Sequence, residues 1–312
     1  MPNLTCPAIA HRFIDLQVNG YVGVDFNDPE TSLNELARSA QAMLDDGVEA
    51  ALPTVITASP EAMIRCLENI GRARETSEVA HQVFRGVHIE GPFLSPVDGY
   101  IGAHPKQHAA SQDQSLLERL LDTAGDLAKI VTLAPEIDLD GRMTCQCHER
   151  GIVVAAGHSD ATLSQLEKCI DAGLSLFTHL GNGCPSLMNR HNNIIYRALH
   201  LKDRLQYSLI ADGFHVPELL FRCLLDWVPL KNLLVVSDAI SAAGLGPGTY
   251  RLGDRSVTIG EDRACRDASG DHFVGSASRM QDADCWLRDS LGLDEPTRQS
   301  LLLQNPARLL DL

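Results

Sequence analysis

The chain of 312 residues is long for one domain but fits a barrel of alternating strands and helices, and its 44% of hydrophobic residues suffices for a large core. The formal net charge of −15 argues against a nucleic-acid partner, because phosphate binding requires clustered Lys and Arg. The nine cysteines lack paired spacing, so we expect no disulfide framework. The sequence shows neither an N-terminal apolar signal segment nor an apolar run of about 18 residues, so we expect a cytoplasmic protein without a membrane span.

Short apolar segments recur along the chain, and helical patterns separate most of them. The expected strands are Phe13–Val18, Ala50–Ile56, Val83–Ile89, Lys129–Leu133, Gly151–Ala156, Leu174–Thr178, Tyr207–Ala211 and Asn232–Ser237. Amphipathic stretches between them include Leu33–Asp46, Pro60–Arg74, Ser115–Leu121, Leu163–Ala172 and Pro217–Trp227. This alternation predicts an α/β fold, a (β/α)8 TIM barrel, as a single domain over residues 1–312.

Two segments depart from the alternation. Residues 246–274 contain GPGTYRLGDRSVTIG and read as a β-hairpin insertion after the eighth strand. The stretch Glu295–Leu310 reads as a terminal helix that closes the chain.

Polar or ionisable side chains stand where the expected strands end. In such barrels the active site is built at these carboxyl ends by the following loops. A nearly complete ring of polar residues is therefore a stronger signal than any one of its members. The ring contains Gln17 with Asn19, Glu90, Glu136, His158, His179, Asp212 with His215, and Asp238.

Glu90, His158 and His179 form a candidate metal site within this ring. A carboxylate with two imidazoles is a ligand set that catalytic zinc uses, with one position left for water. The ligands are far apart in the sequence, and only the barrel brings them together. The alternative for each histidine is a hydrogen bond to the backbone, and for Glu90 an ion pair with a nearby Arg or Lys.

Asp238 follows the eighth strand and could take a proton from a metal-activated water and pass it to the leaving group. Its alternative role is an N-cap, which is frequent for Asp. His104 and His215 could hydrogen-bond a substrate, or they could be ordinary surface histidines.

A series of motifs resembles one known family from Phe13 to Leu310, in the order of that family. They are GVHIEGPFLSP, GYIGAHP, LAPE, AAGHSDAT, FTHLGN, IADGFHV, VSDAISAAG, GSA and NPARLL. The family is the N-acetylglucosamine-6-phosphate deacetylases of the amidohydrolase superfamily. The resemblance implies that the chain removes an acetyl group from an amino-sugar phosphate, with acetate as the second product.

The resemblance also implies roles for single residues. Glu90, His158 and His179 would bind the metal, and Asp238 would act as general base and then as general acid. His104 would contact the substrate near its carbonyl. His215, Asn182 and Gly183 would hold the sugar and its phosphate. Arg190 stands at the family's phosphate-binding arginine, which reaches into the neighbouring subunit in relatives and so implies a homodimer; otherwise it is a solvated loop residue.

The chain departs from the family pattern in three places. Where the family usually has His-x-His in the first strand, this chain has Gln17-Val18-Asn19. We therefore expect one metal ion rather than two, zinc or else iron. Gln17 and Asn19 would then be hydrogen-bond partners to the site or to solvent. The residues after Arg190 are His191-Asn192-Asn193 where the family has Glu-Pro-Gly, so the sugar and its phosphate stay open. The family's accessory β-sandwich is expected to be absent or reduced to the hairpin of residues 246–274.

Two further functions remain as alternatives. The chain could be a different amidohydrolase that acts on another N-acyl sugar or a small amide. It could also be a catalytically silent sugar-binding barrel, although a binding protein has no need of a base such as Asp238 beside a metal.

Overall fold

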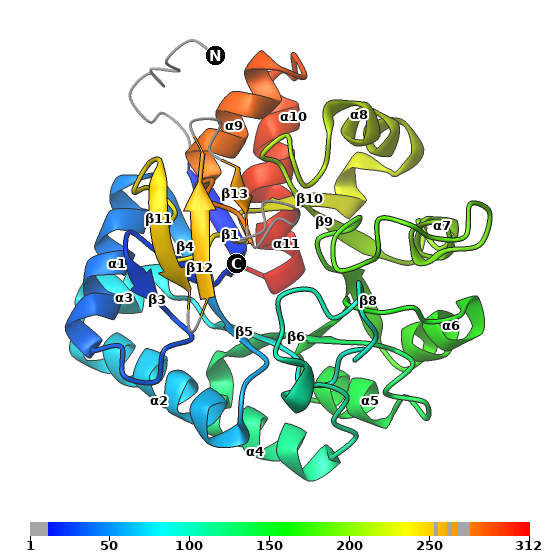
Figure 1. Ribbon diagram of the computed structural model, residues 1–312, viewed down its shortest axis with the longest axis horizontal. Helices are drawn as coiled ribbons and strands as arrows, with labels where there is room; N and C mark the ends of the chain where they lie inside the picture. The colour runs from blue at the N-terminus through cyan, green and yellow to red at the C-terminus, as the bar shows by residue number, and fades with distance from the viewer. Residues whose placement is uncertain (1–11, 253–254, 261–263, 267–274) are drawn as a thin grey trace.

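The computed structural model describes residues 12–252, 255–260, 264–266 and 275–312. Within them, eight strands form one sheet, and every neighbouring pair is parallel. The sheet curls into a nearly closed barrel inside a ring of helices (Figure 1). Its strands, in order, are β1 (Phe13–Val18), β4 (Val48–Ile56), β5 (Val87–Glu90), β6 (Ala128–Leu133), β7 (Val153–Ala156), β8 (Leu174–Phe177), β9 (Gln206–Ile210) and β10 (Leu233–Val236).

The barrel helices lie between consecutive strands. They are α1 (Leu33–Asp45), α2 (Pro60–Thr76), α3 (Glu78–Val83), α4 (Gln114–Ala124), α5 (Arg142–Glu149), α6 (Leu163–Asp171), α7 (Ile194–His200) and α8 (Glu218–Trp227). Local signals explain where several begin: Ser32 and Thr162 complete capping boxes before α1 and α6, and Pro60 is the first residue of α2. The shorter elements are the pair β2 (Gly20–Tyr21) and β3 (Val24–Asp25), and the 3-10 turns Lys106–His108, Gly125–Leu127 and Leu230–Asn232.

The end of the chain closes one end of the barrel. After α9 (Met280–Asp289) come α10 (Glu295–Gln299), a π-helical turn (Ser300–Gln304) and α11 (Asn305–Leu310). Leu303, Ala307 and Leu310 pack against the aliphatic residues inside the barrel, which include Leu16 and Leu176. The single terminal helix expected from the sequence is thus interrupted by a π-helical turn.

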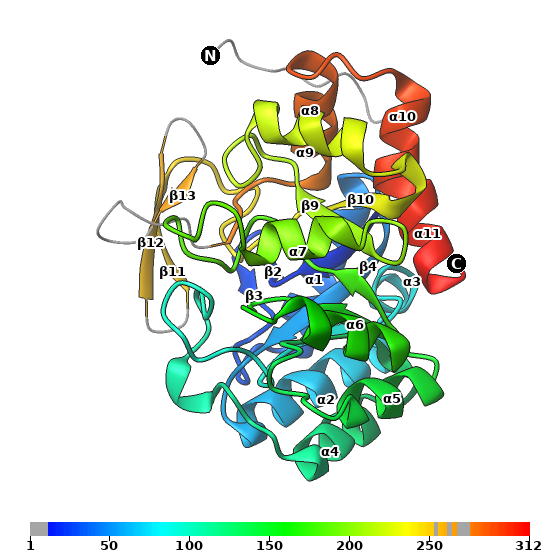
Figure 2. The ribbon, with the colours of Figure 1, turned by 90° about the vertical axis from the view of Figure 1, so that its right-hand side faces the viewer.

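A small antiparallel sheet stands at the opposite end, over the carboxyl ends of the barrel strands (Figure 2). It consists of β11 (Gly248–Leu252), β12 (Arg255–Ile259) and β13 (Cys265–Arg266). The insertion therefore has three strands rather than the two of a hairpin, and residues 253–254, 261–263 and 267–274 lie outside the described part of the chain. Val257 and Ile259 pack on Ile240 and Ala242, which follow the eighth barrel strand.

The expected strands agree with the structure to within a few residues, with one larger difference. The segment at Val83 was expected to start a strand, but Glu78–Val83 is a helix and the strand begins at Val87. Ser77 explains the difference, because its side chain accepts a hydrogen bond from Ala80 N and caps the helix.

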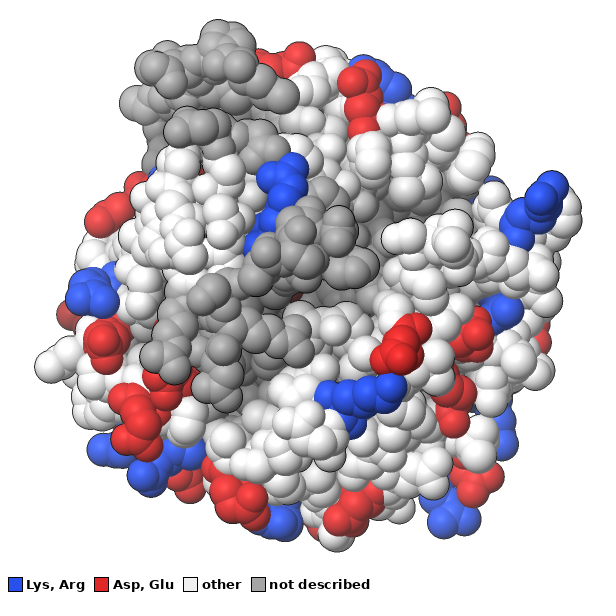
Figure 3. Space-filling model, in the orientation of Figure 1, with Lys and Arg blue, Asp and Glu red and all other residues white. Residues whose placement is uncertain are grey.

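The surface agrees with the overall charge. On the face shown in Figure 3, acidic and basic side chains are interspersed, and the described residues in that view form no broad basic patch. Among the described residues, no helix is long and apolar enough to cross a membrane.

Candidate metal centre and active site

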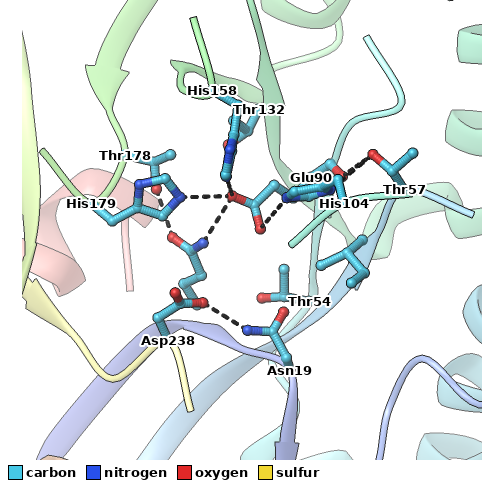
Figure 4. Close-up of polar contacts among 12 residues, drawn as sticks. Asn19, Thr54, Thr57, Glu90, His104, Thr132, His158, Thr178, His179 and Asp238 are labelled. Atoms are coloured by element: carbon cyan, nitrogen blue, oxygen red, sulfur yellow. Dashed lines mark hydrogen bonds and ion pairs between the residues drawn. The ribbon is translucent and has the colours of Figure 1, made fainter. Parts of the chain in front are cut away.

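Glu90 ends one strand, and His158 and His179 each follow another; the three side chains converge at the carboxyl end of the barrel (Figure 4). Oε1 of Glu90 lies 2.9 Å from Nε2 of His179 and 3.3 Å from Nε2 of His158. All three side chains are buried. Burial alone would raise the pKa of Glu90, but its bonds to the two histidines and the nearby His104 hold that pKa well below its ordinary value. The carboxylate is therefore ionised and faces two imidazoles.

The tautomer of His158 shows that this cluster fits a cation. Nδ1 of His158 lies 2.8 Å from the carbonyl oxygen of Tyr100, which can only accept, so Nδ1 carries a proton. In a neutral ring, Nε2 is then an acceptor that faces the Glu90 carboxylate, which is also an acceptor. Two acceptors this close require a proton or a metal ion between them. Nδ1 of His179 is buried and has no hydrogen-bond partner among the described residues.

His104 joins the same cluster. Its Nε2 lies 3.9 Å from Oε2 of Glu90, and its ring centroid lies 4.4 Å from that of His158. Ligand atoms of Glu90, His104 and His158 all lie within 4.8 Å of one another, so His104 is a further possible metal ligand as well as a substrate contact. Nδ1 of His104 lies 2.9 Å from the hydroxyl of Thr57, which orients the ring.

Gln17 and Asn19 are hydrogen-bond partners inside the site. Gln17 donates from Nε2 to Oε1 of Glu90 over 3.1 Å and accepts from the hydroxyl of Thr178 over 2.6 Å. Asn19 donates from Nδ2 to Oδ1 of Asp238 over 2.7 Å. Gln17 thus links Glu90 to the residue just before His179.

Asp238 is half-buried beside this cluster. Burial raises the pKa of Asp238 to about 6; the negative charge of Glu90 adds to the rise, whereas His179 and His215 oppose it. A carboxylate whose pKa lies near neutrality can both accept and release a proton at physiological pH.

His158, His179 and Asp238 share an unusual backbone conformation. Each is the second residue after its strand, and their φ angles are 50°, 30° and 47°. This left-handed region is costly for residues with a Cβ atom, and such conformations cluster at functional sites. The turn directs each side chain to the barrel mouth.

The remaining predicted substrate-binding residues surround the mouth, except one. His215 donates from Nδ1 to Oδ2 of Asp212 over 2.6 Å, and Asn182 donates from Nδ2 to the carbonyl of His179. A Cβ atom on Gly183 would lie 2.8 Å from Nδ1 of His158, so the loop passes directly over that ring and requires glycine there. Arg190 is exposed, and none of the ion pairs among the described residues involves it.

Several residues that hold this site together were not predicted from the sequence. Thr57, Thr178 and the carbonyl of Tyr100 orient its histidines and Gln17, and Ser208 accepts from His179 N. A signal existed for Asp15, because Asp15, Gln17 and Asn19 alternate along one strand and so project to the same side.

Comparison with known proteins identifies the family. No protein-family model matches the chain. N-acetylglucosamine-6-phosphate deacetylase of Bacillus subtilis (strain 168) is 30% identical over 96% of this chain and 74% of its own length. The chain belongs to the N-acetylglucosamine-6-phosphate deacetylase family. The human deacetylase is 35% identical over 80% of the chain, and the match spans 62% of the human protein, less than two thirds of its length.

A solved deacetylase structure agrees with this family. The N-acetyl-D-glucosamine-6-phosphate deacetylase of Mycobacterium smegmatis, determined in complex with N-acetyl-D-glucosamine-6-phosphate, superposes with a TM-score of 0.86. It is 28% identical, and the match covers 97% of this chain and 77% of that protein.

Proposed function

We propose that the chain hydrolyses the N-acetyl group of an amino-sugar 6-phosphate, with N-acetylglucosamine-6-phosphate as the leading substrate. The observation that carries this proposal is the convergence of Glu90, His158 and His179 beside a half-buried carboxylate, Asp238. Membership in the deacetylase family and the similarity to a protein determined with this sugar phosphate support it.

Glu90, His158 and His179 would hold one divalent ion, zinc or else iron. When bound, such an ion acidifies a water molecule and polarises the amide carbonyl. Asp238 takes a proton from the attacking water and returns it to the nitrogen of the departing amine, so that the products are acetate and the free amino sugar. His104 hydrogen-bonds the carbonyl oxygen, while Asn182, Gly183 and His215 position the sugar and its phosphate.

The acting unit in this proposal is a homodimer in the cytoplasm. Arg190 is exposed on its own chain, which suits a residue that contacts the phosphate in the partner's pocket. The cysteines among the described residues are free, as is usual in the reducing cytoplasm.

The decisive experiment measures acetate release from N-acetylglucosamine-6-phosphate, its C4 epimer and the sugars without phosphate. We expect turnover of a phosphorylated sugar with about one equivalent of metal per chain, because Gln17 and Asn19 offer neutral amides in place of a second set of imidazoles. Asp238→Asn should keep the fold and the metal but lower kcat by at least about 100-fold.

Three results would contradict this assignment. Turnover near that of the native protein in Asp238→Asn would remove Asp238 as the base. Two tightly bound ions with Gln17 or Asn19 as ligands would refute the single-metal site. Sugar binding without acetate release would favour a silent binding barrel, and release only from another amide would favour a different amidohydrolase.

A further inference from the structure

The first and last strands of the barrel meet at a seam with little regular pairing. β1 and β10 are the two ends of the sheet order, and one isolated bridge, Val18 with Ala239, joins the described residues across the seam. Backbone bonds reinforce it, from Asp238 N to Gln17 O over 2.9 Å and to Ala239 O from Asn19 N over 2.7 Å and Gly20 N over 3.1 Å. Asp238 therefore lies at the seam where the barrel closes, outside any regular strand ladder.

A buried carboxylate occupies this seam below Asp238. Asp15 is 1% exposed. Its Oδ1 accepts from Ser237 N over 3.1 Å and from Gln17 N over 3.4 Å, and its Oδ2 accepts from the hydroxyl of Ser237 over 2.5 Å. Among the described residues, Asp15 makes no ion pair with an Arg or Lys. These bonds therefore fasten the two strands directly.

The same contacts hold the residues immediately before and after Asp238 in the chain. Ser237, which precedes it, is held by Asp15 at its backbone N–H and at its hydroxyl. The Ser237 oxygen in turn accepts from the N–H of Ala239, the residue that follows, over 3.1 Å. Asp238 itself has a φ of 47°, which a residue with a Cβ atom adopts only when its surroundings impose it.

We propose that Asp15 is a positioning residue that, through Ser237, holds Asp238 in the orientation needed for proton transfer. This inference rests on the proposed function, in which Asp238 is the base. Asp15 does not touch substrate or metal in this account, since both of its oxygens are occupied by Ser237 and Gln17.

The test is a double-mutant cycle in the metal-loaded protein, with acetate release from N-acetylglucosamine-6-phosphate as the assay. Asp15→Ala should lower kcat by about 10-fold or more, change KM by less than about 3-fold and leave the metal content unchanged. In the Asp238→Asn background, Asp15→Ala should change kcat by less than about 2-fold, because no base is left to position.

Asp15→Asn is the matched control. Its amide oxygen can still accept from Ser237 N and Gln17 N, and the Ser237 hydroxyl can turn to Gln17 O, which lies 3.4 Å away. We expect kcat within about 3-fold of the native value, which rescues the loss seen with alanine. If Asp15→Ala does not fold, Ser237→Ala replaces it in the cycle, since it removes the hydroxyl that links Asp15 to Ala239.

Two outcomes overturn the inference: an unchanged kcat in folded Asp15→Ala, or equal losses in the native and Asp238→Asn backgrounds. The second would mean that Asp15 acts independently of Asp238. Failure of the proposed function is separately visible, as absent acetate release by the native protein or an unaffected Asp238→Asn variant, and either would overturn both proposals.

Discussion

At the scale of single residues, three side chains at the mouth of this barrel share one backbone conformation. His158, His179 and Asp238 each stand two residues beyond a strand in a left-handed conformation, and a neighbouring side chain or strand fixes each turn. Ser208 accepts from the N–H of His179, for example, and Gln17 O accepts from that of Asp238. The backbone strain is therefore sustained by contacts between strands, so the orientation of these side chains depends on neighbouring strands.

Residue types at the strand ends predicted which acids and histidines converge here, but not how they are held. A parallel barrel brings its strand ends together, so acids and histidines at those ends could be placed in one site from the order of strands alone. His and Asp adopt a positive φ more often than most residues do, but the residue type does not locate it, because the contacts that impose it come from residues distant in sequence. The contact of Thr57 with His104 likewise joins residues distant in sequence, and residue type does not indicate it.

The pH dependence of stability tests the environment of Asp15. Burial raises the pKa of Asp15 to about 7 from an ordinary value of 3.8, although bonds from Ser237 and Gln17 oppose the rise. Between these two pKa values, the folded state keeps a proton on Asp15 that the unfolded state has lost. The stabilising contribution of Asp15 is therefore complete below pH 3.8 and is lost as the pH rises towards about 7. Asn at this position has no proton to lose.

We therefore expect the free energy of unfolding of Asp15→Asn to increase relative to that of the native protein as the pH rises. The difference should grow by at most about 1.4 kcal/mol per pH unit up to pH 7 and level off above it. Urea unfolding of both proteins at matched metal saturation, between about pH 5 and pH 8, measures it. Parallel curves over this window would show that Asp15 does not titrate there.

At the scale of elements, the barrel strands and the long periodic helices were predictable, and the short helices were not. In the sequence, helices such as α1 and α6 are indicated by an apolar stripe and a capping box. The short helices α5 and α7 offer at most two turns of pattern, and α7 begins with an Asn193 cap inside a polar loop. Tertiary packing rather than local propensity decides such elements.

The small sheet of β11, β12 and β13 is tied to the site by its apolar face. Val257 and Ile259 are buried against Ile240 and Ala242, which lie two and four residues after Asp238, and Ala103 beside His104 packs on the same cluster. The sheet thus covers segments that carry two predicted catalytic groups. The turn signals of residues 246–274 indicated strands, but not where their apolar side would rest.

Truncation of this apolar contact should destabilise the protein. Ile259→Ala removes a side chain that is 3% exposed, and we expect the free energy of unfolding to fall by roughly 2–4 kcal/mol. Thr258→Ala is the matched control on the exposed face of the same strand, with an expected change within about 0.5 kcal/mol. Equal effects of the two substitutions in chemical denaturation would show that this face does not pack as described.

At the scale of the whole molecule, one barrel gathers all but one of the predicted site residues. The exception is Arg190, on a loop whose shape is set by its own asparagines: Oδ1 of Asn189 accepts from the N–H groups of His191 and Asn192, and Asn192 accepts from Arg197. The residues that depart from the family pattern are therefore engaged in building the loop. Its exposed arginine makes sense in the proposed homodimer, where it would reach the partner's pocket.

Subunit complementation tests this arrangement. Arg190→Ala should raise KM for a phosphorylated sugar by about 10-fold or more and barely affect an unphosphorylated one, because a guanidinium binds phosphate through charge-assisted hydrogen bonds. Asp238→Asn should be nearly inactive on both.

In a mixed dimer of the two variants, the pocket with an intact Asp238 receives an intact Arg190 from the other chain. After subunit exchange of an equal mixture, about a quarter of all pockets should be native, so activity at low substrate should approach a quarter of that of the native protein. Activity equal to the mean of the two parents would mean that Arg190 serves its own chain or no phosphate at all.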